Sequence, residues 1–448
     1  MNVRFMIGLV NMLSFAILVV NNVTWFWAGD EDLITALNTV WVMFAATLVF
    51  FMEGGFALLE AGLVQTKNTV SIVMKVMADV TIGSLVFAVI GFGLMYGASR
   101  NGWFGFSGFF FHGHPLLVSH LPTPVLWFFE MAFAVAAVSI VSGAVSERMK
   151  FSAYLVYVII GVTAYSISAH WVWNPDGWLN RLGMIDFAGS SVVHAFGGFS
   201  ALAAAILVGP RIGRFAKNPV VFRPSNLPLA FVGTFILWFG WFGFNAGSTL
   251  SALSPLIGTI AVNTMLAAAI GGLTAMLVTR ITSGTYDPTM VINGALSGLV
   301  AITAGCASVT PSGALWIGAA AGVLVVLGTS MLNRLKVDDP VGAAPVHAAN
   351  GMFGTIAVGL FATHGGLFYG GGARLLGVQS LGTFTISAWG FGVTALALGI
   401  MRWCGFLRVS ASDESDGLDI RVHGHRAYQH YAPPLPEEVN LSTTDVAR

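Results

Sequence analysis

The chain has 448 residues, of which 56% are hydrophobic and only 9% are charged. An ordinary soluble domain carries about 25% charged residues, so this composition excludes a soluble globular protein. The 20 basic and 20 acidic residues balance to a net charge of zero, which leaves no basic excess for binding the phosphates of nucleic acid.

Residues 1–28 open the chain with an apolar stretch behind Arg4. A basic start and a short apolar run are typical of a secretory signal peptide, which would be removed on export. No A-x-A cleavage site precedes Asp30, which instead favours an uncleaved signal anchor. The sequence leaves both interpretations open.

Eleven longer apolar runs follow, separated by polar breaks. A helix needs about 20 mostly apolar residues to cross a bilayer. The runs therefore predict an all-α polytopic membrane domain of eleven core transmembrane helices over residues 37–405, and the polar segment 409–448 predicts a tail. The expected spans lie near residues 37–63, 70–96, 123–144, 152–171, 190–208, 227–248, 257–279, 287–304, 313–332, 345–363 and 382–403.

Basic residues gather in the loops that follow the odd-numbered spans. Short cytoplasmic loops carry an excess of Lys and Arg. We therefore expect the first span to start outside the cell and the C-terminal tail to lie in the cytoplasm. The residues behind this orientation are Lys67, Arg148, Lys150, Arg211, Arg214, Lys217, Arg280, Arg334, Lys336, Arg402 and Arg408.

Short motifs recur five spans apart. Val193-His194-Ala195 in the fifth span matches Val346-His347-Ala348 in the tenth. The first and sixth spans share a Gly-Phe pair that begins at Gly55 and at Gly243. Segments an odd number of spans apart cross the membrane in opposite directions. The chain is thus predicted to form two inverted five-helix repeats plus a final helix, which is a common transporter plan.

His194 and His347 occupy equivalent places in these repeats. Titratable side chains in hydrocarbon are costly, so they are candidates for function. A lone membrane histidine is often only a hydrogen-bonding partner between helices, but a matched pair favours a site at the middle of the bilayer. Neutral imidazole suits that place because it offers one donor and one acceptor.

Aromatic residues gather near the outer ends of the spans. Trp173 ends the fourth span, and Phe129 and Phe133 share one helix face in the third. These rings fit either an anchoring belt at the membrane interface or a vestibule that attracts cations. Ser248, at the outer end of the sixth span, offers an acceptor oxygen to such a cation.

Acidic residues precede two of the helices. Asp186 stands before the fifth span, where a carboxylate caps free amide groups, and a role in orienting a cation site stays open. Asp338 and Asp339 make the same kind of helix start before Pro340.

Four charged residues lie inside the first two spans. Lys75 and Asp79 are spaced i, i+4 and are expected to neutralise each other. Glu53 and Glu60 lie on one face of the first span. These two glutamates either pair with other helices or belong to a protonation pathway.

No enzyme signature is present. The chain contains no H-E-x-x-H motif, no G-x-S-x-G elbow and no phosphate-cradling loop. Its clustered histidines lack the spacing of metal ligands, so we expect no metal, no cofactor and no enzymatic activity. These histidines are His112, His114, His120, His423 and His425.

Several separate segments resemble the ammonium transporter family, in its Amt branch rather than its Rh branch. The resemblance runs from about Thr39 to Tyr428. It implies a homotrimer in the plasma membrane, the inner membrane of a bacterium, with one pore for ammonium or ammonia in each subunit. The segments are GFALLEAGLVQTKN at 55–68, DFAGSSVVH at 186–194, GWFGFNAGS at 240–248, VDDP at 337–340 with His347, and the tail motif within 417–428.

The resemblance also implies roles for single residues. Phe129 and Phe133 match a stacked outer gate to which Phe244 contributes, and Trp241 lines the pore beside them. Trp173 and Ser248 match the outer ammonium site, and Asp186 matches a buried acid near it. His194 and His347 match twin histidines that line the pore.

Three features depart from the family. The stretch Ala343-Ala344-Pro345-Val346 before His347 stands where relatives more often have a Phe-Gly pair, so the tenth helix is expected to start differently. Glu130 stands where relatives often have glutamine or another neutral residue. The tail motif implies docking of a PII-type cytoplasmic regulator, but His425 replaces a usual acidic residue, which leaves that regulation open.

We expect ammonium to pause at the outer site, lose its proton and cross as ammonia, because an apolar lumen rejects ions. Whether the proton follows, making transport electrogenic, stays open. An ammonium sensor and an Rh-type gas channel are alternatives. Trp173 favours the Amt branch over the Rh-type channel.

Overall fold

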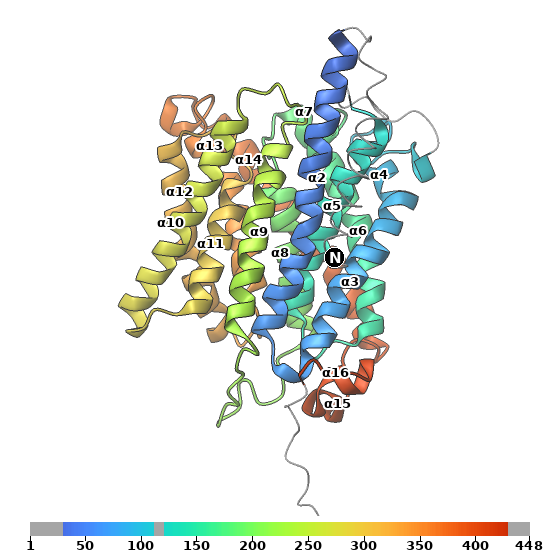
Figure 1. The fold of residues 1–448 in the computed structure, drawn as a ribbon, viewed down its shortest axis with the longest axis vertical. Coiled ribbons are helices and arrows are strands. Elements are labelled where there is room, and N and C mark those ends of the chain that lie inside the picture. Colours follow the sequence, from blue (N-terminus) through green and yellow to red (C-terminus); the bar gives the residue numbers. More distant parts are fainter. Residues whose placement is uncertain (1–29, 112–120, 429–448) are drawn as a thin grey trace, which may run out of the picture.

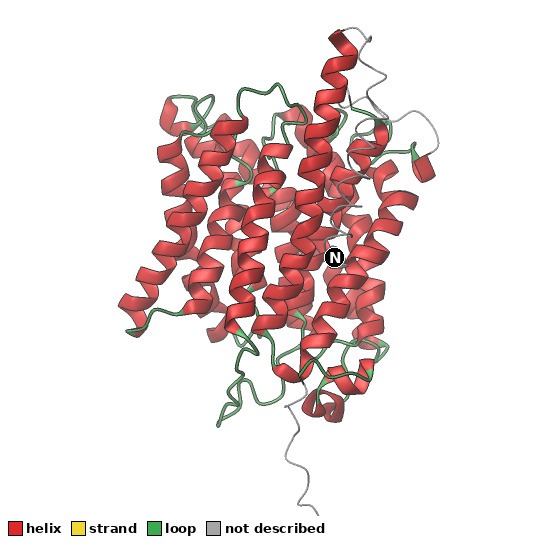
Figure 2. Ribbon diagram, in the orientation of Figure 1, coloured by secondary structure: helices red, strands yellow, loops and turns green. Residues whose placement is uncertain are grey.

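The computed structural model describes residues 30–111 and 121–428. This part of the chain is a bundle of helices joined by loops, with one isolated β-bridge between Met149 and Arg408 (Figures 1 and 2). Residues 1–28, on which the signal-peptide prediction falls, lie outside the described residues, as do His112, His114 and His120. The predicted all-α membrane fold is confirmed.

The helices follow the apolar runs of the sequence. The third predicted span coincides with its helix, whereas the first and last helices extend beyond their apolar runs. The α-helices are α2 (Asp30–Leu63), α3 (Thr69–Val86), α4 (Phe92–Tyr96), α5 (Thr123–Ala144), α6 (Phe151–Trp173), α7 (Trp178–Leu182), α8 (Phe196–Val208), α9 (Leu227–Gly247), α10 (Ile257–Ser283), α11 (Pro288–Ile302), α12 (Pro311–Arg334), α13 (Asn350–Phe361), α14 (Arg374–Trp403), α15 (Ala411–Asp416) and α16 (Leu418–His423).

Three π-helical segments interrupt or open spans. They are η3 (Phe87–Gly91), between α3 and α4, η5 (Ser190–Ala195), which opens α8, and η6 (Ala344–Ala349), which opens α13. Short 3-10 turns are η2 (Thr66–Asn68), η4 (Phe109–Phe111) and η7 (Leu367–Tyr369). Single π-helical turns occur often at functional sites, and η5 and η6 carry the two predicted pore histidines.

Nine helical stretches in the described part are long and apolar enough to cross a membrane, and α11, with 15 residues, is a shorter apolar helix. The tenth predicted span is formed by η6 and α13, and its place agrees with the prediction. Each of the eleven predicted ranges therefore contains a helix.

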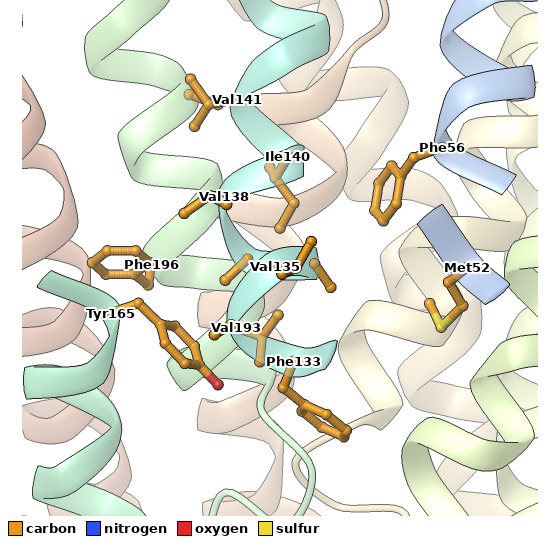
Figure 3. Close-up of a cluster of buried hydrophobic side chains, with 14 of the residues drawn as sticks. Met52, Phe56, Phe133, Val135, Val138, Ile140, Val141, Tyr165, Val193 and Phe196 are labelled. Atoms are coloured by element: carbon orange, nitrogen blue, oxygen red, sulfur yellow. The ribbon is translucent and has the colours of Figure 1, made fainter. Parts of the chain in front are cut away.

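Helix α5 lies at the centre of the bundle. Figure 3 shows its apolar side chains surrounded by residues of α2, α6, η5 and α8. A helix that is apolar around its whole circumference is expected in the interior of a bundle. The labelled side chains are Met52, Phe56, Phe133, Val135, Val138, Ile140, Val141, Tyr165, Val193 and Phe196.

The inverted repeat is visible in how the two histidine segments begin. The Asp186 carboxylate accepts hydrogen bonds from the backbone N–H groups of Ser191 and Val192, at 2.8 Å each. The Asp339 carboxylate does the same for Ala343 and Ala344, at 3.1 and 2.8 Å. Each aspartate stands eight residues before its histidine and three before a glycine with positive φ. Capping by Asp186 and by Asp339 is confirmed.

Two glycines let these segments cross in close contact. A Cβ on Gly198 would lie 2.1 Å from the backbone nitrogen of Ala348. A Cβ on Gly351 would lie 2.6 Å from the backbone nitrogen of Ala195. The partner residue number falls as the residue number rises, so the two segments run antiparallel. Each glycine follows its histidine by four residues, which brings the histidines together at the crossing.

The interpretation of Asp338 as a helix cap was wrong. Its carboxylate accepts hydrogen bonds from Nε and a terminal nitrogen of Arg211 at 2.8 and 2.9 Å. Burial alone would raise the pKa of Asp338, but the hydrogen bond and charge of Arg211 and the charge of Arg148 lower it to about 2. Two adjacent aspartates look alike in sequence, yet only Asp339 faces the free amides of η6.

The described part of the tail folds back onto one end of the bundle, where α15 and α16 lie below α3 (Figure 1). Asp419 accepts hydrogen bonds from the backbone N–H groups of Val70 and Ser71 at 3.0 and 2.8 Å. Lys67 donates to the carbonyl oxygens of Glu414 and Ser415. The tail is therefore anchored on the same end as the loop that carries Lys67, which the sequence predicts to be cytoplasmic.

Candidate functional site

A cavity of about 110 Å³ lies near the other end of the bundle. Four residues singled out from the sequence meet in its wall, although they come from three helices. Phe129 and Phe133 lie on α5, Trp173 ends α6, and Ser248 follows α9. Among the described residues, the lining consists of Tyr96, Phe129, Glu130, Phe133, Trp173, Phe187, Ser248 and Leu250.

Trp173 is fixed in this wall through Asp186. Its indole Nε1 donates a hydrogen bond to the backbone carbonyl of Asp186 at 2.8 Å. The ring also lies close to Gly189, where an added Cβ would meet it at 3.3 Å. Gly189 has a φ of 110°, which favours glycine over any other residue. Asp186 thus holds Trp173 through its backbone carbonyl and holds the start of η5 through its carboxylate. Asp186 is not among the described residues that line the cavity.

Ser248 presents an acceptor to the cavity. Its hydroxyl donates to the carbonyl oxygen of Phe244 at 2.8 Å, one turn earlier in α9. A hydroxyl oxygen also has two acceptor lone pairs. Because its proton is used in that bond, the Ser248 hydroxyl can serve a molecule in the cavity only as an acceptor.

Next to the cavity, two phenyl rings from different helices pack against each other. Phe133 and Phe244 stack with their centroids 3.9 Å apart and their planes at 23°. Phe129 and Phe133, by contrast, are tilted by 45° at 4.7 Å. The three rings that the resemblance assigns to an outer gate thus lie in contact, and the closest stack among them is between Phe133 of α5 and Phe244 of α9.

The histidines continue the same line of rings. His194 stacks against Trp241 and Phe244, at centroid distances of 5.0 and 5.5 Å. Its Nδ1 lies 3.3 Å from Nδ1 of His347. One ring donates this hydrogen bond and the other accepts it, so a neutral pair satisfies both nitrogens. The predicted meeting of the two histidines in the interior is confirmed in geometry.

Trp241 is held in place by its own hydrogen bond. Its indole Nε1 donates to the hydroxyl of Thr303 at 2.9 Å. The ring is 1% exposed, and it covers one face of His194. Trp241 therefore packs on His194 from a fixed position.

Sequence reasoning missed Tyr96 as a wall residue and found no explanation for Glu130. The Tyr96 hydroxyl donates to Oε1 of Glu130 at 2.6 Å, across the gap between α4 and α5. Tyr96 stands at the outer end of its predicted span, as Trp173 and Ser248 do. That shared position is the signal that could have found it.

The charged residues of the first two spans lie in a separate buried cluster. Glu53 and Glu60 accept hydrogen bonds from Ser139 and Ser142 of α5, at 2.8 and 2.6 Å. Of the two alternatives for these glutamates, the structure contains the first, in which they pair with another helix.

Lys75 is attracted by the opposite charge of Asp79, as expected, but its Nζ makes no hydrogen bond to that carboxylate. Both carboxylate oxygens of Asp79 accept from the Tyr154 hydroxyl, at 2.9 and 2.8 Å. Nζ of Lys75 has no hydrogen-bond partner among the described residues and lies 5.5 Å from the centre of the Tyr154 ring. The hydrogen-bonding partner of the Asp79 carboxylate is thus a tyrosine from α6, and not the lysine that follows from i, i+4 spacing.

Comparison with known proteins places this geometry in a family. The model of the Ammonium Transporter Family matches residues 40–428. Ammonium transporter Amt2 of Archaeoglobus fulgidus is 44% identical over 420 residues, which cover 88% of this chain and 89% of that protein. Ammonium transporter 1 member 3 of Solanum lycopersicum is 37% identical over 443 residues, covering 89% and 94%.

Solved structures agree with this assignment. A structure titled Sensor Amt Protein is 40% identical, with a TM-score of 0.82 over 88% of this chain and 99% of that one. Mep2 of Candida albicans is 29% identical, with a TM-score of 0.79 over 87% and 90%. Family model, relatives and structures coincide, and the chain belongs to the ammonium transporter family.

Proposed function

We propose that the chain transports ammonium by binding the cation in the cavity at Phe129, Trp173 and Ser248 and separating it into ammonia and a proton. Ammonia moves inward, and the proton follows separately along the hydrogen-bonded pair His194 and His347, so that one positive charge crosses with each ammonia molecule. The observation that carries the proposal is the continuous line of contacts below the cavity. The stacked pair Phe133 and Phe244 leads to His194, and His194 reaches His347.

The cavity suits a small cation that carries N–H donors. Aromatic faces attract cations by about 0.5 to 2 kcal/mol, and more when the cation is desolvated. Phe129 and Trp173 supply such faces, and Ser248 supplies an acceptor oxygen. None of the eight lining residues is basic.

The passage below the cavity suits a neutral molecule. Phe133, Trp241 and Phe244 are each at most 1% exposed, and a charge is costly among such rings. Ammonium can avoid this cost by leaving its proton behind, whereas potassium has no proton to lose. The deprotonation step therefore gives selectivity that size alone cannot give.

The histidine pair gives ammonia its polar partners in this apolar passage. His194 Nε2 is buried without a partner among the described residues. An imidazole nitrogen in that state exchanges a hydrogen bond with a passing ammonia molecule. The Nδ1 contact between the two rings orders their tautomers.

Assembly and regulation extend the proposal. Homotrimer formation in the plasma membrane, surrounded by lipid, is proposed from the family resemblance. Docking of a PII-type regulator is proposed for the end where the tail is anchored by Asp419 and Lys67.

Ammonium sensing is a second candidate function. It is favoured by the 40% identity to the protein titled Sensor Amt Protein. A sensor that barely transports would bind ammonium without a measurable current, so the experiment below separates the two functions.

The test replaces His194 or His347 with alanine and records ammonium-driven current from purified protein in liposomes. We expect either change to lower the current by about tenfold or more, since a positioned side chain that handles a proton contributes at least that much. His170→Ala is the matched control, because His170 is also buried but bonds to the Met95 carbonyl away from the passage. Unchanged current in both pore variants would contradict the proposed role of the pair.

A further inference from the structure

Among the described residues that line the outer cavity, Glu130 is the one acidic residue. It lies on α5 between the two phenylalanines of that wall and is only 4% exposed. Its Oε1 accepts a hydrogen bond from the Tyr96 hydroxyl at 2.6 Å. Its Oε2 is buried and has no hydrogen-bond partner among the described residues.

A buried carboxylate oxygen without a donor is costly. Buried polar groups in folded proteins nearly always have a hydrogen-bond partner, and an ionised one needs a partner most. The other lining residues cannot supply one in this arrangement. Tyr96 already donates to Oε1, and the Ser248 hydroxyl donates to a backbone carbonyl. For an ionised Glu130, an occupant of the cavity that carries a donor would supply the missing partner.

The cavity limits what that occupant is. Its volume of about 110 Å³ excludes a large metabolite. Aromatic rings on the remaining walls favour a cation. A small cation with several N–H donors can donate a hydrogen bond to the unpaired oxygen of Glu130 and also contact the aromatic faces. A bare metal ion usually needs several oxygen ligands, and the described lining residues offer one carboxylate.

We propose that Glu130 Oε2 is a direct ligand of the ammonium ion in the outer cavity and that its negative charge raises the affinity of this site. The inference rests on the proposed function. Tyr96 is a positioning residue in it, because its hydroxyl holds Oε1 and leaves Oε2 without a partner among the described residues. The carboxylate adds to the cavity a full charge that aromatic rings and a hydroxyl lack.

The opposing view is that Glu130 is protonated, neutral and only a hydrogen-bonding partner of Tyr96. In that case its replacement by glutamine would leave ammonium binding unchanged, because glutamine keeps the shape and the acceptor for Tyr96. The two views therefore differ in one measurable quantity, the ammonium concentration that gives half-maximal current.

The test compares Glu130→Gln with the wild type in liposomes over a series of ammonium concentrations. We expect the half-saturating concentration to rise about ten- to hundredfold, as for the loss of one hydrogen bond between charged groups. Methylammonium, which also carries a charge and N–H donors, should show a rise of the same order.

Glu53→Gln is the matched control. Glu53 is also a buried glutamate with one oxygen bonded to a hydroxyl, that of Ser139, and the other without a partner among the described residues. It does not line the cavity, so its replacement should leave the half-saturating concentration unchanged. Glu130→Asp keeps the charge but withdraws it by one methylene, and we expect a smaller rise.

The outcomes are distinct. An unchanged half-saturating concentration in Glu130→Gln, with intact wild-type transport, would overturn the inference but not the proposed function. Absence of ammonium current in the wild type would overturn the proposed function itself. If Glu130→Gln does not give a folded protein on size exclusion, Glu130→Asp decides the question by the same measurement.

Discussion

Replacement of Gly198 by alanine should separate the two histidines without touching either of them. The added Cβ would lie 2.1 Å from the backbone nitrogen of Ala348 and 2.5 Å from the carbonyl carbon of His347. Ordinary contact begins near 3.4 Å, so the first of these contacts alone requires α8 and η6 to move apart by about 1.3 Å. Both contacts are with backbone, so no side chain can rotate away.

The consequence for the pore follows from the Nδ1 distance. The Nδ1 atoms of His194 and His347 are already 3.3 Å apart. A further displacement of about 1.3 Å carries them beyond hydrogen-bonding distance. Overpacking a close contact of this kind costs about 1 to 3 kcal/mol of stability. We therefore expect Gly198→Ala to lower both the apparent melting temperature and the ammonium-driven current.

The control for this experiment is Gly392→Ala in α14. A Cβ on Gly392 meets nothing within 4 Å, and alanine favours an exposed helix by about 1 kcal/mol over glycine. That variant should keep full current and equal or higher stability. If Gly198→Ala matched it in both measurements, the close crossing of the two histidine segments would not be what positions the pair.

Two further predictions concern the end that carries the tail. Asp338→Asn should lower the stability at pH 7 by about 2 kcal/mol. The difference in stability between the wild type and this variant should be full above the ordinary aspartate pKa of 3.8. It should fade as the pH falls toward about 2, the pKa of Asp338 in the folded protein. Melting curves over this pH range check it, with Asp416→Asn, in an exposed ion pair, as a control that should change little. For topology, Ser412→Cys in a Cys404→Ser background should react with an impermeant thiol reagent from the cytoplasmic side only, and labelling from outside intact cells would contradict the predicted orientation.

Much of the fold could be predicted because a membrane span is a property of one local segment. Apolar length alone located α5 to the residue and the other spans within several residues. The repeat was also readable, since His194 and His347 share their neighbours. The wider pattern from Asp186 to Gly198 and from Asp339 to Gly351 was present in the sequence as well, but its glycines gain meaning only once two backbones are seen to touch.

The parts that sequence reasoning could not supply depend on contacts between distant segments. Spacing on α5 paired Phe129 with Phe133, while the closer stack uses Phe244 from α9. Spacing on α3 paired Lys75 with Asp79, while a tyrosine from α6 takes the carboxylate. In both cases helical periodicity gave the neighbours along one helix, and packing between helices decided which contacts form.

Glu130 shows the same limit at the site itself. Its neighbour Phe129 marked the position as close to the predicted pore. Only the structure reveals that Glu130 lines the cavity, and that Tyr96 binds one of its oxygens while the other has no partner among the described residues.

The most direct test of the deprotonation account is a comparison of wild-type currents under matched ammonium and potassium gradients in liposomes. The two cations are similar in size and charge, so a pore that merely selects cations by size would pass both. The account predicts ammonium-driven transport with no potassium current, because potassium has no proton to leave at the cavity. Potassium current comparable to the ammonium current would contradict it.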